Sequence, residues 1–318
     1  MARNVLVTGE TLIDFIPERS GPLEEVAGFE RRPGGAPANV AVALARLERP
    51  PFFWTRVGDD SFGRYLERTL AEYGLPDRFV ERDADAKTAL AFVTHDETGD
   101  REFSFYRDGT ADTRLEPGRI DDETLAACEW VHAGGVALSS GTARAATLDL
   151  LERAAAAGCT VSFDPNWRPE LWSDEETFAA AMDDALAHVD VCFATVAELE
   201  ALGVDGDSPR GLARAAIDRW SGHTVVLTRG SEGAVAAAGD DAPWSADAVE
   251  HPGFDVDAVD TTGAGDAFVG GAIDALQRGH DLADAAAFAN AVAATATTAP
   301  GAMTALPTRE DVTAVLER

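Results

Sequence analysis

Lysine is almost missing from this sequence: Lys87 is the only one, and every other basic residue is arginine. Against 26 basic residues stand 56 acidic ones, so the net charge is −30. Such a surface repels nucleic-acid phosphates and anionic membranes alike. We therefore expect neither nucleic acid nor a membrane surface as a partner.

Long apolar runs and closely spaced cysteines are missing as well. No apolar stretch reaches the roughly 18 residues of a membrane-spanning helix. Glu10 interrupts the apolar N-terminal run and no cleavage site follows it, so we expect no signal peptide. Cys128, Cys159 and Cys192 form no CxxC pair, which excludes a disulfide framework or a zinc site. These absences predict a cytoplasmic protein with buried thiols.

The acid excess is spread evenly along the 318 residues. In dilute buffer such a surface repels itself. At about 1 M salt the screening length falls to roughly 3 Å, and the repulsion is screened. We hypothesise that the protein works in a halophilic cytoplasm. An ordinary acidic enzyme is the alternative.

Short apolar runs alternate with longer helix-forming stretches along most of the chain. Strands are expected at 5–7, 52–57, 130–133, 160–163, 191–193 and 225–228. Helices are expected at about 38–47, 60–73, 142–157, 175–186, 210–220, 265–278 and 282–298. This alternation predicts an α/β fold with a Rossmann-like parallel sheet sandwiched by helices.

One region departs from this alternation. Two strand-like runs, 88–94 and 101–106, flank a polar turn at 96–100 and predict a β-hairpin. Because hairpin strands fit poorly inside a parallel sheet, we expect a small separate β-sheet built from about 15–31 and 88–113. This sheet would form a lid over the sheet edge where ligands bind in open α/β folds. The expected organisation is a single domain, 1–318, with the lid inserted in it.

The sharpest local feature is the segment Gly263-Ala264-Gly265-Asp266, which opens an Ala-rich helix. Free amides at a helix start, together with the helix dipole, favour an anion such as phosphate. The segment matches neither the Walker A loop nor the dinucleotide fingerprint. Asp266 is either a helix cap or a general base that takes a proton from a substrate hydroxyl. The flanking glycines favour the base, with the amides balancing charge on a transferred phosphoryl group.

A second glycine cluster, Gly34-Gly35-Ala36-Pro37-Ala38-Asn39, also precedes a helix. The paired glycines allow a small polar ligand to come close. Asn39 offers both donors and an acceptor to hydroxyl groups. A plain turn followed by a helix start is the alternative interpretation.

Together the two segments resemble the signatures of the ribokinase-like (PfkB) carbohydrate kinases. Gly58, in Arg56-Val57-Gly58-Asp59-Asp60, lies at the expected distance from the first segment. The resemblance runs from Gly9-Glu10 to Gly301 and implies a ribokinase-like fold with a β-sheet lid. It also implies transfer of the γ-phosphoryl group of ATP, with Mg²⁺, to a sugar hydroxyl. In this interpretation Asp266 is the base, and Gly263, Ala264 and Gly265 belong to the anion hole.

Further positions are implied by the same resemblance. Sugar contacts are expected from Asp14, Gly34, Gly35, Asn39, Tyr106, Arg107, Arg168 and Asp266. ATP contacts are expected from Asn166, Thr228, Gly230, Gly233, Gly263, Gly265 and Asn290. Glu198 would order Mg²⁺ waters, although Thr195 stands where the family often has asparagine. A monovalent cation, usually K⁺, would be held by Asp260, Thr262, Ala296, Ala299 and Gly301.

The acceptor is expected to be fructose, because the closest likeness is to the fructokinase-like subgroup. It is carried by Gly9-Glu10-Thr11-Leu12-Ile13-Asp14, Gly34 to Asn39, residues 103–108 with Ala111-Asp112, and residues 164–172. An acid sugar, 2-keto-3-deoxygluconate, is the main alternative, with Arg168 or Arg107 binding its carboxylate. Arg168 in a structural ion pair and Tyr106 in sheet packing are the other interpretations of these two residues. A nucleoside or 6-phosphofructose acceptor carries lower weight.

Two alternatives come from other classes of protein. A non-catalytic sugar-binding regulator would be expected to have lost Asp266 or the glycines, and this chain has both. An NAD-dependent dehydrogenase would carry GxGxxG after its first strand, where this chain has Gly9-Glu10-Thr11-Leu12. The family's members often pair through the lid sheet, so a homodimer is also expected.

Overall fold

The computed structural model describes residues 5–317 apart from 20, 96–100, 221–223 and 245–247. Nine strands form the main sheet in the order β13-β12-β11-β10-β9-β8-β1-β4-β5. Their bounds are β1 (Val5–Thr8), β4 (Phe52–Gly58), β5 (Val80–Asp83), β8 (Trp130–Gly134), β9 (Thr160–Asp164), β10 (Val191–Thr195), β11 (Thr224–Thr228), β12 (Ala234–Ala238) and β13 (Ala248–His251). All pairs from β5 to β11 are parallel, which confirms the α/β prediction.

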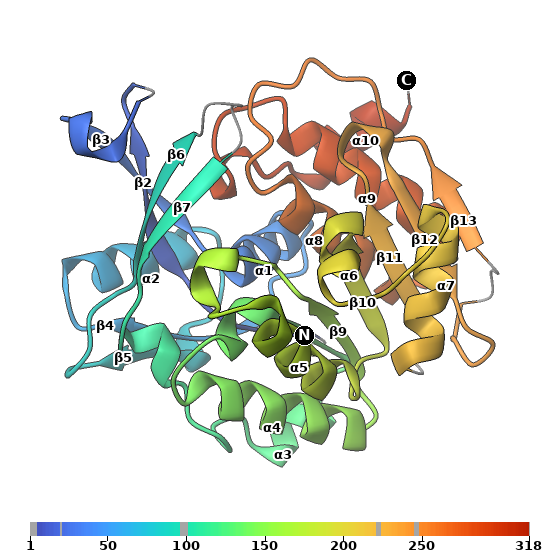
Figure 1. Ribbon diagram of the computed structural model, residues 1–318, viewed down its shortest axis with the longest axis horizontal. Coiled ribbons are helices and arrows are strands. Elements are labelled where there is room, and N and C mark those ends of the chain that lie inside the picture. Colours follow the sequence, from blue (N-terminus) through green and yellow to red (C-terminus); the bar gives the residue numbers. More distant parts are fainter. Residues whose placement is uncertain (1–4, 20, 96–100, 221–223, 245–247, 318) are drawn as a thin grey trace.

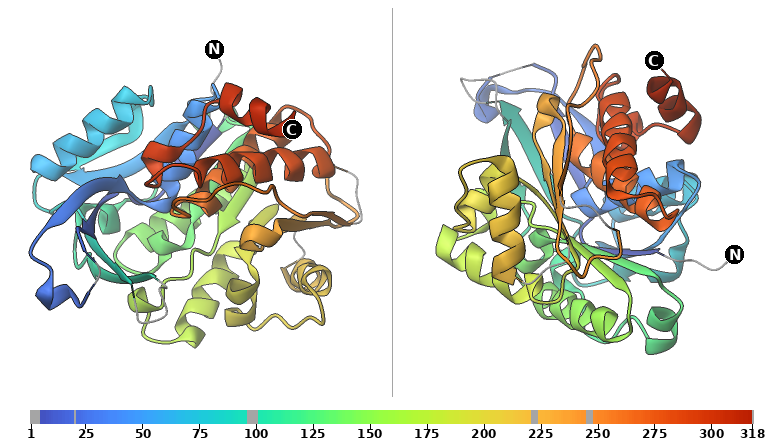
Figure 2. Two further views of the ribbon diagram at one scale, coloured as in Figure 1. Left: turned by 90° about the horizontal axis from the view of Figure 1, so that it is seen from above. Right: turned by 90° about the vertical axis from the view of Figure 1, so that its right-hand side faces the viewer.

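Helices cover both faces of this sheet (Figure 2). Their bounds are α1 (Ala36–Arg46), α2 (Ser61–Glu72), α3 (Asp122–Ala126), α4 (Ala143–Ala156), α5 (Glu175–Leu186), α6 (Val196–Ala201), α7 (Pro209–Trp220), α8 (Ala264–Gln277), α9 (Leu282–Ala296) and α10 (Arg309–Leu316). One core contains Val5 and Val7 with residues of α1, α8, α9 and α10. The other contains Leu6 with residues of α3, α4, α5, α6 and α7. Successive residues of β1 thus point into opposite cores, which is why its apolar run is continuous.

A second sheet of four strands, in the order β3-β2-β6-β7, lies beside the main one (Figure 1). Its strands are β2 (Leu12–Pro17), β3 (Phe29–Gly34), β6 (Leu90–His95) and β7 (Arg101–Tyr106). The predicted hairpin strands pair as β6 and β7, while the predicted turn at 96–100 lies outside the described residues. β2 and β3 begin and end farther out than the predicted 15–31. Asp14 therefore belongs to this sheet.

The strands β12 and β13 were not expected from the sequence. β12 runs antiparallel to β11, and β13 runs antiparallel to β12. β12 is Ala-Val-Ala-Ala-Ala, a composition that favours helix, and only burial between β11 and β13 makes it a strand. No described helix is long and apolar enough to cross a membrane.

Candidate active site

The glycine segments meet at the carboxyl edge of the parallel strands. Gly263 is the N-cap of α8 and has a φ of +73°, a left-handed conformation that glycine adopts without strain. A side chain there would also come within 2.8 Å of Ala302. The Ala264 amide donates to the carbonyl oxygen of Thr261 at 3.3 Å, whereas the amides of Gly265 and Asp266 have no partner within the helix. The sequence prediction of a helix opened by this segment is confirmed.

Asp266 and Asn39 link the two segments directly. The Nδ2 atom of Asn39, on α1, donates a hydrogen bond of 2.8 Å to Oδ2 of Asp266, on the first turn of α8. Withdrawal from water raises the pKa of Asp266 to about 6, against the opposing effects of Asn39 and Arg168. Glu198 adds a smaller repulsion. The result is a carboxyl that gains and loses a proton close to neutral pH, as a general base requires.

Two further carboxyls lie near Asp266. The pKa of Asp164, at the end of β9, is raised by burial and by the charges of Glu198 and Asp266. Glu198 accepts hydrogen bonds from the backbone amides of Trp167 at 2.9 Å and Thr195 at 2.7 Å. The Thr195 hydroxyl in turn caps α6 through the Glu198 amide. Thr195 thus positions Glu198 through a capping box, at the place where the family often has asparagine.

A cavity of about 680 Å³ opens beside the start of α8. Five predicted nucleotide residues line it, namely Thr228, Gly230, Gly233, Gly265 and Asn290. Gly233 has a φ of +78°, and a Cβ atom there would lie 2.0 Å from the carbonyl oxygen of His251. Gly263 and Asn166 do not line this cavity. Asn166 follows β9 in a left-handed conformation and donates its amide proton to Asp164.

A second cavity, of about 420 Å³, lies between the four-stranded sheet and the loops flanking α8 and α9. Asp14, Arg32 and Phe103 line it from the sheet side. Asp260, Thr262 and Gly301 line it from the loops. The predicted sugar residue Asp14 and part of the predicted cation set therefore share one cavity.

Asp260 joins two loops that are far apart in sequence. Its Oδ1 accepts hydrogen bonds from the amide and the hydroxyl of Thr262, at 2.9 and 2.5 Å. Its Oδ2 accepts one from the Gly301 amide at 2.8 Å. Ala296 ends α9 and Ala299 follows it closely, just before Gly301. The structure thus brings Asp260, Thr262 and Gly301 together around one carboxylate.

Gly34 and Gly35 let neighbouring polar groups come close. A Cβ atom on Gly34 would lie 2.0 Å from Oδ2 of Asp14. One on Gly35, whose φ is +104°, would lie 2.5 Å from the carbonyl oxygen of Glu10. Any side chain at these two positions would collide with the segment that carries Glu10 and Asp14.

The two predicted arginines lie in different surroundings. Arg168 extends over the Phe103 ring, 5.5 Å from its centroid, and its charge acts on Asp266. Arg107 is buried and donates hydrogen bonds to Asp112 at 2.5 Å and to Ser139 at 2.7 Å. The charge of Arg168 therefore acts on Asp266, whereas Arg107 forms a buried ion pair with Asp112.

The prediction that Tyr106 contacts the sugar is not supported by its position. Tyr106 pairs with Leu90, which pairs with Ile13, so its side chain points to the face opposite Asp14. There its ring packs edge-on against Phe92 at 5.3 Å. The alternative of sheet packing accounts for Tyr106. Phe103 and Phe105, which alternate with it, pack with Leu12 and Ala91 on the face that carries Asp14.

Sequence reasoning gave no role to Glu10 or Arg32. Glu10 is buried at 3% exposure directly after β1. Arg32 lies on β3, opposite Asp14, with its Nη1 close to Gly301. A charged residue beside a glycine-rich segment, after a strand for Glu10 and within one for Arg32, is the signal that could have indicated both.

Comparison with known proteins agrees with this arrangement. The model of the "pfkB family carbohydrate kinase" matches residues 2–309. A curated fructokinase of Klebsiella pneumoniae is 38% identical, with 98% of this chain and 99% of the relative covered.

Two solved structures are similar throughout. A fructokinase from Xylella fastidiosa with bound ATP superposes with a TM-score of 0.85 at 33% identity, covering 100% of this chain and 99% of that one. A fructokinase double mutant from Vibrio cholerae O395, in a form with fructose, ADP and potassium ion bound, has a TM-score of 0.84 at 34% identity and covers 99% and 98%. Sequence signatures, fold and full-length similarity lead to one conclusion: this chain belongs to the pfkB family of carbohydrate kinases.

Proposed function

We propose that this carbohydrate kinase is a fructokinase that transfers the γ-phosphoryl group of ATP to a hydroxyl of fructose. The observation that carries the proposal is the hydrogen bond of 2.8 Å between Asn39 and Asp266 at the first turn of α8. It joins Asp266, whose pKa is raised, to the side-chain amide of Asn39 beside the first backbone amides of α8. The similarity to fructokinases over the whole chain supports fructose as the acceptor.

In the proposed reaction Asp266 accepts the proton of the attacking sugar hydroxyl, which is worth roughly 10²- to 10⁴-fold in rate. Asn39 holds the Asp266 carboxyl in place through its amide. The amides of Gly263, Ala264, Gly265 and Asp266 balance charge on the transferred group. Asp14, Gly34 and Gly35 contribute the sugar side of the site, together with Asn39 and Arg168.

The cavity of about 680 Å³ fits a nucleotide in size and in lining. In this proposal Thr228, Gly230 and Gly233 approach the ribose and phosphates, and Asn290 lies against the base. Asn166 supports the phosphate path from β9. Bound ATP supplies the phosphoryl group.

Two cations are part of the proposal. Glu198 and the raised-pKa carboxyl of Asp164 form an acidic pair that suits Mg²⁺ held mainly through phosphates and water. Mg²⁺ would neutralise phosphate charge there. Oxygen ligands around Asp260, Thr262 and Gly301, with carbonyls near Ala296 and Ala299, suit a monovalent cation such as K⁺. A relative that contains potassium supports this part.

Assembly and environment complete the proposal. The four-stranded sheet acts as a lid that excludes water during transfer. The same sheet joins two copies into a homodimer. The chain operates as a single domain, 1–318, in a cytoplasm, and the net charge of −30 suits a halophilic interior rich in K⁺.

A 2-keto-3-deoxygluconate kinase is the second candidate. The position of Arg168, whose charge acts on Asp266 and whose guanidinium lies over Phe103, favours it, because an acid sugar needs a cation beside the base. Truncation of this side chain separates the two candidates.

A panel of sugars incubated with ATP, Mg²⁺ and molar KCl, followed by ADP release, tests the proposed function. We expect the highest kcat/KM with fructose. Arg168→Ala should lower kcat/KM for an acid sugar far more than for fructose, and the exposed Arg68→Ala serves as control. Preference for the acid sugar would establish the second candidate instead. Sugar binding without turnover would make the chain a regulator.

A further inference from the structure

Arg32 is a charged residue to which the proposed chemistry gives no task. It lies on β3 of the four-stranded sheet, directly opposite Asp14 on β2. Both residues line the cavity of about 420 Å³ between this sheet and the loops flanking α8 and α9. The Arg32 side chain is only 24% exposed, so the cavity shelters most of this guanidinium from water.

The Arg32 guanidinium reaches across to the loop that follows α9. A Cβ atom on Gly301 would lie 2.7 Å from Nη1 of Arg32 and 2.5 Å from the hydroxyl oxygen of Thr304. Gly301 also has a φ of +94°, a conformation that glycine adopts without strain. The guanidinium thus occupies the space that a side chain at position 301 would need, and an arginine of the four-stranded sheet lies against this loop.

The same loop belongs to the proposed monovalent-cation site. The Gly301 amide donates a hydrogen bond to Oδ2 of Asp260 at 2.8 Å, and Thr262 donates two to Oδ1 of that carboxylate. These three residues line the cavity that Arg32 lines from the sheet side. The ligands they offer a cation are oxygens, which fits a hard ion. A fixed positive charge therefore lies beside a proposed site for a mobile one.

The neutralisation of Arg32 is incomplete. Glu30, two positions earlier on β3, accepts a hydrogen bond of 2.8 Å from Nη2 of Arg32. The Glu30 side chain is 60% exposed, and ion pairs with such exposed partners are weak. Arginine also keeps its proton at every working pH. Its positive charge consequently persists inside the cavity, where water screens it less than at the surface.

We propose that Arg32 sets the affinity of the monovalent-cation site, because its guanidinium repels the cation and keeps binding weak. The inference rests on the cation site of the proposed function. Two like charges beside one sheltered cavity repel each other by an amount worth several-fold in a binding constant. A weak site fills only when K⁺ is abundant, which suits a chain with a net charge of −30 in a salt-rich interior.

The test is Arg32→Gln, which removes the charge and keeps most of the side-chain length. The apparent dissociation constant for K⁺ should fall about fivefold. It is measured from the rise in melting temperature as KCl replaces choline chloride at constant ionic strength, since a ligand of the folded state stabilises it. This readout needs neither sugar nor ATP, and a cooperative melt shows that the variant folds. Arg32→Lys keeps the charge and should remain near wild type.

Two neighbours on β3 provide matched variants. Arg31→Gln changes the net charge equally, but Arg31 lies on the other face of the sheet, over the Tyr65 ring at 3.9 Å. This variant should leave the K⁺ constant unchanged. Glu30→Gln removes the partner of Arg32 and a nearby negative charge, so the K⁺ constant should rise about twofold.

Three outcomes overturn the proposal. The first is a K⁺ constant that stays the same or rises in Arg32→Gln, since a rise would mean that Arg32 only holds the loop in place. The second is an equal fall in Arg31→Gln, because the effect would then follow net charge alone. The third is a wild-type protein that melts at the same temperature in KCl and in choline chloride.

The melting readout separates this inference from the proposed fructokinase activity. The K⁺ concentration that half-activates sugar phosphorylation should fall in Arg32→Gln by the same factor as the dissociation constant. If no sugar is phosphorylated but the K⁺ constants shift as expected, the proposed activity fails and the role of Arg32 stands. If fructose is phosphorylated but the K⁺ constants do not move, only the role of Arg32 fails.

Discussion

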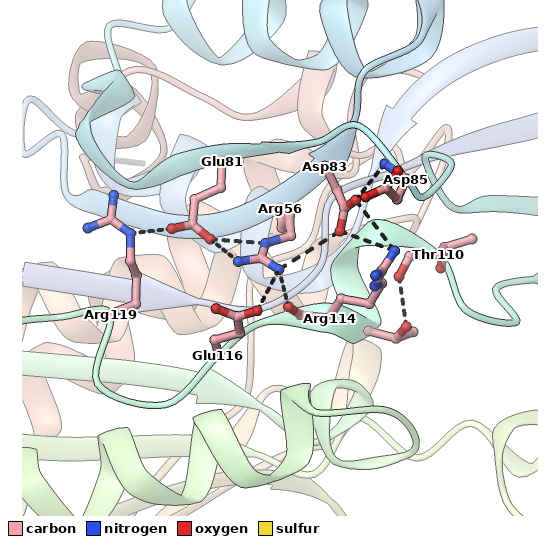
Figure 3. A network of polar contacts seen from close by, with 9 residues as sticks. Arg56, Glu81, Asp83, Asp85, Thr110, Arg114, Glu116 and Arg119 are labelled. Carbon is pink, nitrogen blue, oxygen red and sulfur yellow. Dashed lines mark hydrogen bonds and ion pairs between the residues drawn. The ribbon is translucent and has the colours of Figure 1, made fainter.

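Two groups of carboxylates in this protein are built in opposite ways. At the β4–β5 edge, Glu81 lies between Arg56 and Arg119, and Asp83 lies between Arg56 and Arg114 (Figure 3). The Arg56 side chain is 15% exposed and reaches Glu81 at 3.0 Å. Glu81 and Asp83 thus each have two guanidiniums within ion-pair distance.

The carboxylates of the candidate active site are less fully neutralised by neighbouring arginines. Asp266 is held by the neutral amide of Asn39, and Asp164 by the backbone amide of Asn166. The charge of Arg168 lowers the pKa of both acids, but among the described residues neither acid forms an ion pair with it, and burial raises the pKa of each. The comparison teaches that carboxylates in ion pairs stabilise the fold. Buried carboxylates without an ion pair can still exchange protons and bind cations.

The largest effect is expected from a substitution among the active-site carboxylates Asp266 and Asp164, which have no ion pairs among the described residues. Asp266→Asn should lower kcat at least about a hundredfold, because the amide cannot take the proton of the sugar hydroxyl. The ATP KM should change little, since the backbone amides of α8 stay in place. Steady-state kinetics with the preferred sugar measures both. Near-normal turnover would remove Asp266 from the role of base.

A smaller effect is expected from breaking the paired group. Arg56→Ala leaves Glu81 and Asp83 with one guanidinium each and should destabilise the fold by about 1–3 kcal/mol. Urea unfolding measures the loss, and kcat should remain unchanged. Arg68→Ala, which breaks an exposed pair with Glu72, should have little effect. Equal losses of unfolding free energy in the two variants would mean that the partly buried network stabilises the fold no more than an exposed ion pair does.

The smallest effect is expected from a change in salt concentration, which acts on the charges of both groups of carboxylates. Raising KCl to about 1 M should increase the melting temperature, because it screens the repulsion of a chain with net charge −30. The difference between wild type and Arg56→Ala should persist, since sheltered pairs are screened less than exposed charges. Scanning calorimetry at two salt concentrations checks both. A melting temperature that falls with KCl would contradict the halophilic hypothesis.

The parts of this molecule that follow simple periodicity could be predicted from the sequence. The alternation of apolar runs and Ala-rich stretches indicated the parallel strands and the long helices. The glycine segments indicated the starts of α1 and α8, because positive φ and close approach need glycine there. The helix expected from about residue 60 begins there, because Asp60 is the N-cap of α2 and accepts hydrogen bonds from the amides of Phe62 and Gly63.

Tertiary context decided the rest. β12 consists of helix-favouring alanines and becomes a strand only between its neighbours. Tyr106 lies on the face of the four-stranded sheet opposite Asp14 because strand register, which the sequence does not state, fixes its direction. The charges around Glu10 come from residues 97 to 158 positions away along the chain, so no local pattern could reveal them.

The bond between Asn39 and Asp266 spans 227 positions of the chain. During synthesis the N-terminal glycine segment leaves the ribosome long before its counterpart exists. A nascent or truncated polypeptide that ends ahead of α8 has neither the Asp266 carboxyl nor the first amides of α8, and so lacks the groups to which the proposed reaction assigns proton and phosphoryl transfer. In the proposed reaction, the catalytic group is therefore complete only once the chain extends beyond the start of α8.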